Sequence, residues 1–381
     1  MKILAVDIGT GTQDILLFDS RLDVENAFKL VLPSPTMMVH RKIQQATHQQ
    51  AAVVLTGTVM GGGPAAWAAE AHARAGLPIY ATPLAAATIN DDLSKVEALG
   101  IQIIDDEDAA QFPPEVCQIC LRDFDFQIIL EVFQKFHVPL DDLAAVAVAA
   151  FDHGAAPPEI SDRKFRFDFI RNQILEYNSL SGFAWQSRDI PKTLTRLRAI
   201  GESAKDLHVP LIVMDTAPAA VLGATFDPAA KNHDRIMIAN VGNFHTLAFR
   251  LGPDGIEGLF EHHTGLLDQV SLEHYLLSLA DGTLSNDNTF EDHGHGALIL
   301  SDQPLQMDYP DYNLIVTGPR RSMLAGSSLG VHQAVPFGDM MLAGCFGLIA
   351  ATADCVPDYS EIIHYSLGKI NGLGTPPWEI H

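Results

Sequence analysis

The chain has 381 residues, of which 47% are hydrophobic and 19% charged, so it is long enough for two domains and too apolar for a disordered polymer. Its 47 acidic and 24 basic residues give a formal net charge of −23, which excludes nucleic acid as an expected partner because polyphosphate would be repelled. The apolar runs fall short of the roughly 18 residues of a membrane span, so we expect no membrane partner. Four cysteines are too few to cross-link the chain with disulfides, so we expect a cytoplasmic protein.

Residues 2–19 are the most informative segment, and we expect a strand, a tight turn and a second strand. The first apolar run ends at Asp7. The turn that follows carries two glycines and two hydroxyl side chains, Gly9, Thr10, Gly11 and Thr12. Glycines let backbone amides approach phosphate oxygens, and a carboxylate at a strand end suits hydrated Mg²⁺, so we interpret the turn as a phosphate loop with Asp7 as metal ligand. An ordinary glycine-rich hairpin is the alternative.

The same segment argues against a dinucleotide-binding motif. That motif needs G-x-G-x-x-G at the start of a helix, whereas a strand-like run follows Gly11 here. Asp14 lies at the beginning of this second run, close in sequence to the turn, and is a candidate catalytic carboxylate.

Residues 52–75 predict a strand, a glycine-rich turn from Gly57 to Pro64 and a helix. Such a turn can bind an anion, although a plain strand-to-helix turn is the favoured interpretation. Further along, Cys117 and Cys120 form a C-x-x-C pair. We interpret them as structural thiols, because a zinc site needs a second pair of ligands at matching spacing.

Three segments in the middle of the chain predict further elements. Residues 143–151 read as a buried strand, and His153 follows where α/β folds place active-site groups. Residues 163–171 alternate basic residues with Phe, which indicates a half-buried strand or a basic edge for an acidic substrate. Asp215 precedes a run of small residues and is either a general base or the N-cap of a helix.

Residues 235–251 repeat the first pattern of apolar strand, polar residue, glycine turn and second strand. Asp7 corresponds to Asn240 and Gly9 to Gly242, each displaced by 233 positions (240 − 7 and 242 − 9). A duplicated phosphate-binding hairpin predicts two lobes that face each other across a cleft. The candidate phosphate contacts in this second turn are Asn240, Gly242, Asn243, His245 and Thr246.

Histidines cluster with acidic residues in two places, residues 261–265 and 291–296. Neutral imidazoles beside carboxylates suit Zn or Fe, and the candidate ligands are His262, His263, His293 and His295. The alternative is a solvated loop whose Asp and Gly residues only make turns. His153 and His245 are candidates to face the cleft, although a lone histidine is more often a hydrogen-bonded structural residue.

With these segments in this order, the chain resembles the superfamily of actin, the seventy-kilodalton heat-shock chaperones and the sugar kinases. Residues 215–224 and 338–353 look like its two interlobe helices, and residues 314–321 like its adenosine-binding turn, with Gly318, Arg320 and Arg321 as candidate contacts. The resemblance implies an α/β fold of two ribonuclease H-like actin-type lobes with mixed sheets flanked by helices. The implied lobes are residues 1–225 and 226–381, with ATP and Mg²⁺ bound in the interlobe cleft.

Within that superfamily the chain looks most similar to a prokaryotic family often labelled as pyruvate formate-lyase activating enzymes. Such activators are radical enzymes whose iron–sulfur cluster needs three cysteines in a C-x-x-x-C-x-x-C run. Cys117 and Cys120 cannot supply that run, so we do not expect a radical iron–sulfur activase.

The resemblance implies a Mg²⁺-dependent ATPase or small-molecule kinase, with Asp7 positioning the metal and Asp215 activating the nucleophile. Asn240 stands where the hydrolases of the superfamily usually carry Asp, which favours an alternative: a nucleotide-responsive switch that moves a partner protein with little turnover. The histidines leave a third hypothesis, a metal enzyme on the same scaffold. The expected partners are therefore a nucleotide and an unknown small molecule or partner protein.

Overall fold

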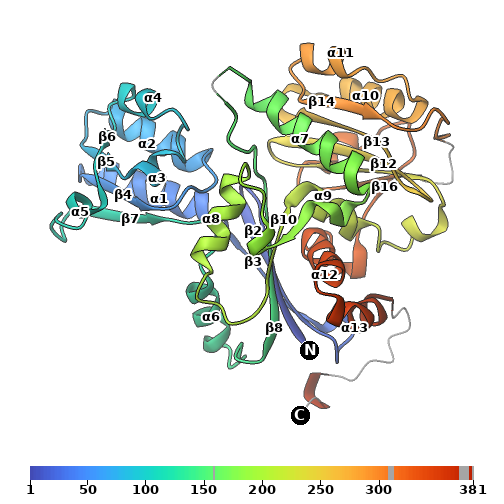
Figure 1. Ribbon diagram of the computed structural model, residues 1–381, viewed down its shortest axis with the longest axis horizontal. Coiled ribbons are helices and arrows are strands. Elements are labelled where there is room, and N and C mark those ends of the chain that lie inside the picture. Colours follow the sequence, from blue (N-terminus) through green and yellow to red (C-terminus); the bar gives the residue numbers. More distant parts are fainter. Residues whose placement is uncertain (158, 308–312, 369–376, 380–381) are drawn as a thin grey trace.

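The computed structural model describes residues 1–157, 159–307, 313–368 and 377–379 (Figure 1). The chain is organised around two six-stranded sheets and a smaller sheet of four strands. Within the described residues, no helix combines the length and the apolar character that crossing a bilayer requires.

The first sheet has the order β3-β2-β1-β8-β10-β9. Its strands are β1 (Lys2–Ile8), β2 (Thr12–Asp19), β3 (Phe28–Pro33), β8 (Leu143–Ala150), β9 (Ala184–Gln186) and β10 (Leu211–Asp215). β1, β2 and β3 form an antiparallel meander, and β8 and β10 continue the sheet in parallel with β1. β1, β8 and β10 are almost continuously apolar because both faces of the sheet are covered there.

The second sheet has the order β14-β13-β12-β11-β15-β16. Its strands are β11 (Ile236–Val241), β12 (His245–Gly252), β13 (Gly255–His263), β14 (Gly296–Ile299), β15 (Leu314–Thr317) and β16 (Val331–Gln333). Again three strands form an antiparallel meander, and two more follow in parallel with its first strand. Five strands follow the same order in both sheets, β3-β2-β1-β8-β10 and β13-β12-β11-β15-β16, and this confirms the expected fold class, a duplicated ribonuclease H-like architecture of the actin type.

A separate unit is inserted between β3 and β8 and lies at the left in Figure 1. Its parallel sheet has the order β6-β5-β4-β7, and it encloses its own hydrophobic core. Its elements are α1 (Pro35–His48), β4 (Val53–Gly57), α2 (Pro64–Arg74), β5 (Ile79–Ala81), α3 (Pro83–Ala86), α4 (Leu93–Ala98), β6 (Gln102–Ile103), α5 (Asp106–Ala109) and β7 (Cys117–Leu121). The strand and helix expected within residues 52–75 are β4 and α2.

Two helices made of small residues, α9 (Thr216–Ala224) and α12 (Ala343–Cys355), cross between the two large sheets (Figure 1). They touch backbone to backbone: a Cβ added to Gly223 would lie 1.7 Å from the Ala343 carbonyl oxygen, and one on Gly347 would lie 1.9 Å from that of Ala219. α12 also packs against β1 and β8, and α13 (Pro357–Gly368) packs against α12. One hydrophobic core therefore runs through both halves of the chain.

Two predictions about elements were wrong. Residues 163–171 are not a strand but part of helix α7 (Asp162–Tyr177). Ser161 caps the N-terminus of this helix, and its side chain accepts a hydrogen bond from Lys164 N. The buried residues of α7 recur with helical spacing: Arg166, Phe167, Ile170, Gln173 and Ile174. The returning helix begins at Ala343 rather than Gly338, because Phe337 and Gly338 have φ values of 50° and 75°, which no α-helix accepts.

The remaining helices cover the outer faces of the two large sheets and connect their strands (Figure 1). They are α6 (Phe126–Lys135), α8 (Thr195–Ser203), α10 (Gln269–Asp281) and α11 (Asn286–Glu291).

Candidate functional site

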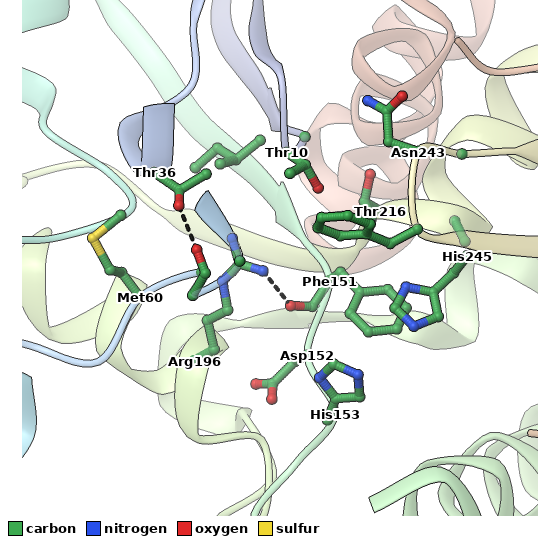
Figure 2. A pocket seen from close by; sticks show the side chains of 18 of the residues that line it. Thr10, Thr36, Met60, Phe151, Asp152, His153, Arg196, Thr216, Asn243 and His245 are labelled. Atoms are coloured by element: carbon green, nitrogen blue, oxygen red, sulfur yellow. Dashed lines mark hydrogen bonds between the residues drawn. The ribbon is translucent and has the colours of Figure 1, made fainter. Parts of the chain in front are cut away.

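A cleft of about 1260 Å³ lies where the two large sheets and the inserted unit meet. Its lining comes from the β1–β2 and β11–β12 turns, the loop before α2, the segment after β8, the first turns of α9 and α12, and the turn after β15. Figure 2 shows Thr10, Asn243, Thr216 and His245 around one part of this space, and Arg196 and Met60 around another.

The two predicted phosphate turns have the same geometry. The Gly9 amide donates to the Thr12 carbonyl over 2.9 Å, and the Gly242 amide donates to the His245 carbonyl over the same distance. Side chains are excluded at both glycines, because a Cβ would lie 3.1 Å from the first carbonyl oxygen and 2.7 Å from the second. The turns also meet, since a Cβ on Gly11 would lie 3.6 Å from Asn243 Nδ2.

Most of the candidate contacts in these turns line the cleft, but Thr246 does not. Alternate residues of a strand point to opposite faces, so Thr246 points away from the cleft while His245 and Leu247 point into it. The Thr246 hydroxyl is fully buried and lies 2.9 Å from the Thr264 hydroxyl. The cleft-lining candidates are Gly9, Thr10, Gly11, Thr12, Asn240, Gly242, Asn243 and His245.

Asp7 and Asp14 lie behind the first turn, and both line the cleft. The Thr216 hydroxyl donates to Asp7 Oδ1 over 2.6 Å. Burial raises the pKa of Asp7 to about 6, with a further increase from the nearby charge of Asp215. Burial and then the charge of Asp7 raise the pKa of Asp14 to about 8. Asp14 Oδ1 is buried without a hydrogen-bond partner among the described residues, so these two carboxyl groups fit a hydrated divalent cation.

Asp215 lies at the end of β10, where it caps α9 by accepting a hydrogen bond from Ala217 N over 3.2 Å. Its carboxylate also pairs with Arg166, at 2.7 Å and 3.4 Å. Arg166 in turn donates to Glu261 at 2.8 Å and 3.0 Å, and all three side chains are buried. The described residues that line the cleft include Thr216 and Ala217 but not Asp215.

The turn after β15 reaches the cleft through Gly318 and Pro319. Gly318 has a φ of +96°, and a Cβ there would lie 2.5 Å from the Val241 carbonyl oxygen, so glycine is required. Arg320 is exposed, and Arg321 Nη1 lies 3.3 Å from the Gly318 carbonyl oxygen. Neither arginine is among the described residues that line the cleft.

Of the four histidines singled out in the two clusters, His263 and His295 come together, with ring centroids 4.6 Å apart, whereas His262 and His293 do not join them. His262 is fully buried and uses both ring nitrogens on carbonyl oxygens, 3.1 Å from His263 O and 2.9 Å from Asp292 O. His263 is half-buried and His293 is exposed. His295 also joins His153 and His245, and the ligand atoms of these three rings lie within 4.8 Å of one another. His263 flanks this trio, with its ring centroid 5.1 Å from that of His245. No sequence spacing connects the three, so only the fold reveals the group.

Arg196 is a cleft residue that the sequence did not reveal, because it is one of two arginines in α8 and no local motif marks it. Its guanidinium pairs with Asp123 at 2.6 Å and 3.0 Å and donates to the Phe151 carbonyl over 2.6 Å (Figure 2). Asp123 also accepts from the Gly61 amide, and the Ala65 amide donates to Thr36 Oγ1. Backbone amides of the glycine-rich loop before α2 are thus already hydrogen-bonded to protein acceptors, as in a strand-to-helix turn.

The ionisable residues of the cleft are predominantly acidic. Only two basic side chains line it, Lys95 and Arg196, within the described part of the chain. Its acidic lining residues are Asp7, Asp14, Asp91, Asp92, Asp152 and Asp162. An anionic ligand therefore needs a cation in this cleft to offset the repulsion.

Residues 60–323 match the model of the family described as "Putative pyruvate format-lyase activating enzyme (DUF1786)". The chain belongs to this family. Among curated proteins, nothing matches the DUF1786 chain.

Several solved structures are similar to the DUF1786 chain. One is the activator of the 2-hydroxyisocaproyl-CoA dehydratase from Clostridium difficile with bound ADPNP. It has 10% identity and a TM-score of 0.34, and the match covers 97% of this chain and 99% of that one. A ROK hexokinase from Thermus thermophilus has 14% identity and a TM-score of 0.30 over 95% and 100% of the two chains. The ethanolamine utilization protein EutJ from Carboxydothermus hydrogenoformans has 11% identity and a TM-score of 0.32 over 91% and 89%. These superpositions are loose, and the duplicated strand order is the stronger mark of the fold.

The cysteines of the DUF1786 chain do not fit an iron–sulfur cluster. Cys117 and Cys120 lie on β7 of the inserted unit, whereas Cys345 and Cys355 lie on α12. Cys345 is fully buried, with its sulfur 3.1 Å from the Asp14 carbonyl oxygen. Three thiolates at one point are what a cluster needs, and these elements do not provide them.

Proposed function

We propose that this DUF1786 protein is a Mg²⁺-dependent nucleotide-binding enzyme that hydrolyses ATP or transfers its terminal phosphate. The observation that carries the proposal is the pair of equivalent glycine turns, one from each large sheet, that line the same cleft, with Asn243 of the second turn next to Gly11 of the first. Phosphate groups bind where several backbone amides converge and side chains are excluded. Both turns line the cleft, and at the first glycine of each turn a side chain would crowd a carbonyl oxygen.

Asp7 is the proposed ligand of the hydrated Mg²⁺, and the Thr216 hydroxyl at 2.6 Å fixes the orientation of its carboxylate. Mg²⁺ bound to the phosphates would supply charge neutralisation in a cleft that is otherwise acidic. The amides of residues 9–12 and 242–245, with the side chains of Thr10, Thr12 and Asn243, are the proposed phosphate contacts, and Gly318 with Pro319 is the proposed floor for the nucleoside.

Asp14 is the proposed acceptor of the proton from water or from a substrate hydroxyl. A general base works best when its pKa lies near the working pH, and the pKa of Asp14 is raised to about 8. Asp215, the residue expected from the sequence to have this role, holds Arg166 and caps α9 with the same carboxylate. We therefore assign Asp215 a positioning role beneath the cleft.

Calorimetry with Mg-ATP on the purified protein tests the site, with ATP in excess chelator as the reference. Binding should weaken at least about 10-fold in Asp7→Ala, because a charge-assisted ligand to the cation is lost. Asp14→Asn should lose phosphate release, with a smaller loss of Mg-ATP affinity than Asp7→Ala. Asp189→Ala, an exposed carboxylate next to Arg188, is the matched control and should match the wild type in both assays. Equal Mg-ATP affinities of Asp7→Ala and wild type would refute the proposal.

A second candidate function is a nucleotide-responsive switch for a partner protein. It is favoured by Asn240, which occupies the position of Asp7 in the second turn and leaves that side of the cleft without the equivalent carboxylate. A switch should bind Mg-ATP as above but release phosphate slowly until its partner is present. Phosphate release measured with and without extract of the source cells separates the two functions.

A further inference from the structure

We propose that His153, His245 and His295 form a binding site for one divalent transition-metal ion at the edge of the cleft. The site is separate from the proposed Mg²⁺ position at Asp7 and does not depend on nucleotide binding. One ligand atom from each ring lies within 4.8 Å of the others, so small side-chain rotations would bring all three to the roughly 2.0–2.1 Å at which imidazole binds Zn²⁺.

The three histidines come from three distant parts of the chain. His153 follows β8 of the first sheet, His245 begins β12 of the second sheet, and His295 immediately precedes β14 of that sheet. His153 and His245 line the cleft, and His295 is buried behind them. Figure 2 shows the rings of His153 and His245 beside Phe151. An ion held by all three would therefore join the two lobes and remain accessible from the cleft.

Unsatisfied ring nitrogens distinguish this group from structural histidines. His245 Nε2 and both nitrogens of His295 are buried without a hydrogen-bond partner among the described residues. A buried polar atom without a partner costs about 1–3 kcal/mol, so such atoms usually have one. His262, by contrast, has a carbonyl oxygen at each ring nitrogen. A metal ion at the centre of the trio would provide the partner that the protein does not.

Aromatic packing fixes the ring of His245. Phe151 stacks on it with a centroid distance of 4.0 Å and an angle of 10° between the planes. Arg166 covers the Phe151 ring at 3.7 Å, and the His153 ring meets it edge-on at 4.7 Å. Metal sites bind strongly when their ligands are held in place before the ion arrives, and this stack holds two of the three.

The charges around the trio determine what else the ion would bind. Burial lowers the pKa of the His295 imidazole most, and the nearby charges of Arg166 and Arg163 lower it further. The charge of Arg166 is offset by Asp215 and Glu261, at 2.7 Å and 2.8 Å. Three neutral imidazoles leave the charge of the ion uncompensated. The fourth position would therefore select an anion, either hydroxide or an anionic oxygen of a substrate that enters the cleft.

The ligand set also limits the metal. Imidazole nitrogen suits Zn²⁺, Fe²⁺, Co²⁺ and Ni²⁺, whereas Mg²⁺ and Ca²⁺ take oxygen ligands. Three histidines with an open fourth position are typical of a reactive rather than a structural zinc site. Zn²⁺ and Co²⁺ are therefore the probes of choice.

The test uses the full chain without a histidine tag, because a tag binds the same ions. After dialysis against chelator, Zn²⁺ is titrated in the calorimeter, and Co²⁺ binding is followed by its visible d–d absorption. We expect one ion per chain, a Co²⁺ spectrum of tetrahedral type, no competition from excess Mg²⁺, and a higher Tm with Zn²⁺ because the ion binds only the folded state.

His153→Ala is the decisive variant, since this side chain is exposed to the cleft and its loss should leave the fold intact. The variant should lose more affinity than the roughly 10–100-fold that an outer-shell partner is worth, along with the Tm gain and the Co²⁺ spectrum. His274→Ala, an exposed histidine of α10, is the control and should bind as wild type. Weak or multiple Zn²⁺ binding that His153→Ala leaves unchanged would overturn the proposal, and so would absence of binding. Neither result would affect Mg-ATP binding at Asp7.

Discussion

Asp7 and Asp14 are directly opposed residues of the antiparallel strands β1 and β2, and both of their carboxyl groups are buried. Two like charges in one buried place cannot both form at low cost, and the pKa values of both groups are raised, mainly by burial. The folded protein therefore stores an electrostatic cost that a divalent cation would relieve.

The first prediction follows from the sign of that cost. Asp14 has a folded pKa of about 8 against 3.8 when unfolded, so above the lower value the unfolded chain gives up this proton more readily. The stability that depends on Asp14 is therefore complete at low pH and is lost as the pH rises towards the folded pKa. We expect the Tm to fall more steeply in wild type than in Asp14→Asn between about pH 4.5 and about pH 7.5, and the difference to stay constant above about pH 8.5. Mg²⁺ should restore part of the loss in wild type alone; parallel pH profiles would contradict the assignment.

A second prediction concerns the helix crossing under the cleft. Gly223→Ala places a Cβ 1.7 Å from the Ala343 carbonyl oxygen, so α9 and α12 must move apart. We expect a loss of about 1–3 kcal/mol, the usual cost of overpacking, measured by urea unfolding. Gly265→Ala is the matched control, because nothing lies within 4 Å of a Cβ there. Equal midpoints for the two variants would show that the helices do not touch as described.

The third prediction concerns the buried ion pairs of Arg166. Replacing Arg166 by Met leaves the carboxylates of Asp215 and Glu261 buried without their cation. Removing one partner of a buried pair costs about 3–5 kcal/mol, which should appear as a lower urea midpoint. Arg188→Met removes an exposed arginine paired with Asp189 and should cost less than about 1 kcal/mol. A small effect at Arg166 would mean that water reaches this network.

A fourth prediction uses the contact between the inserted unit and the second phosphate turn. Trp67 of α2 and Phe244 of that turn meet edge to face, with ring centroids 5.8 Å apart. Trp67 is 55% exposed, so a shift of the insert over a bound nucleotide changes its solvent contact. We expect Mg-ATP to change the tryptophan emission of wild type, and Trp67→Phe to abolish the change. A response that persists in the variant would have to come from another tryptophan.

The sequence predicted the parts of the molecule that depend on local pattern. Apolar runs interrupted by glycine turns predicted the two hairpins, and the run of small residues after Asp215 predicted α9. The paired hairpins also predicted the shared cleft, since both turns line it. Local pattern failed at α7, where Arg and Phe alternate over a short stretch but burial follows a helical repeat set by the second sheet.

The chemistry of the site was less accessible from sequence. His153, His245 and His295 are separated by many residues, and only the pairing of β12 with β13 and β13 with β14 brings the last two together. The clustered histidines were only partly informative: His263 pairs with His245 across the strands and lies beside His295, whereas His262, its neighbour on β13, points to the opposite face. Arg196 and Asp123 find each other only through tertiary packing.

At the crossing of α9 and α12, main chain rests on main chain at Gly223 and Gly347. The gap between the two large sheets is therefore set by peptide groups, whose dimensions are the same in every protein. A side chain at either glycine would push the two helices apart. The two helices beneath the cleft are thus held at a fixed spacing, while the loops that line the cleft are free to diverge and to adapt the molecule to new ligands.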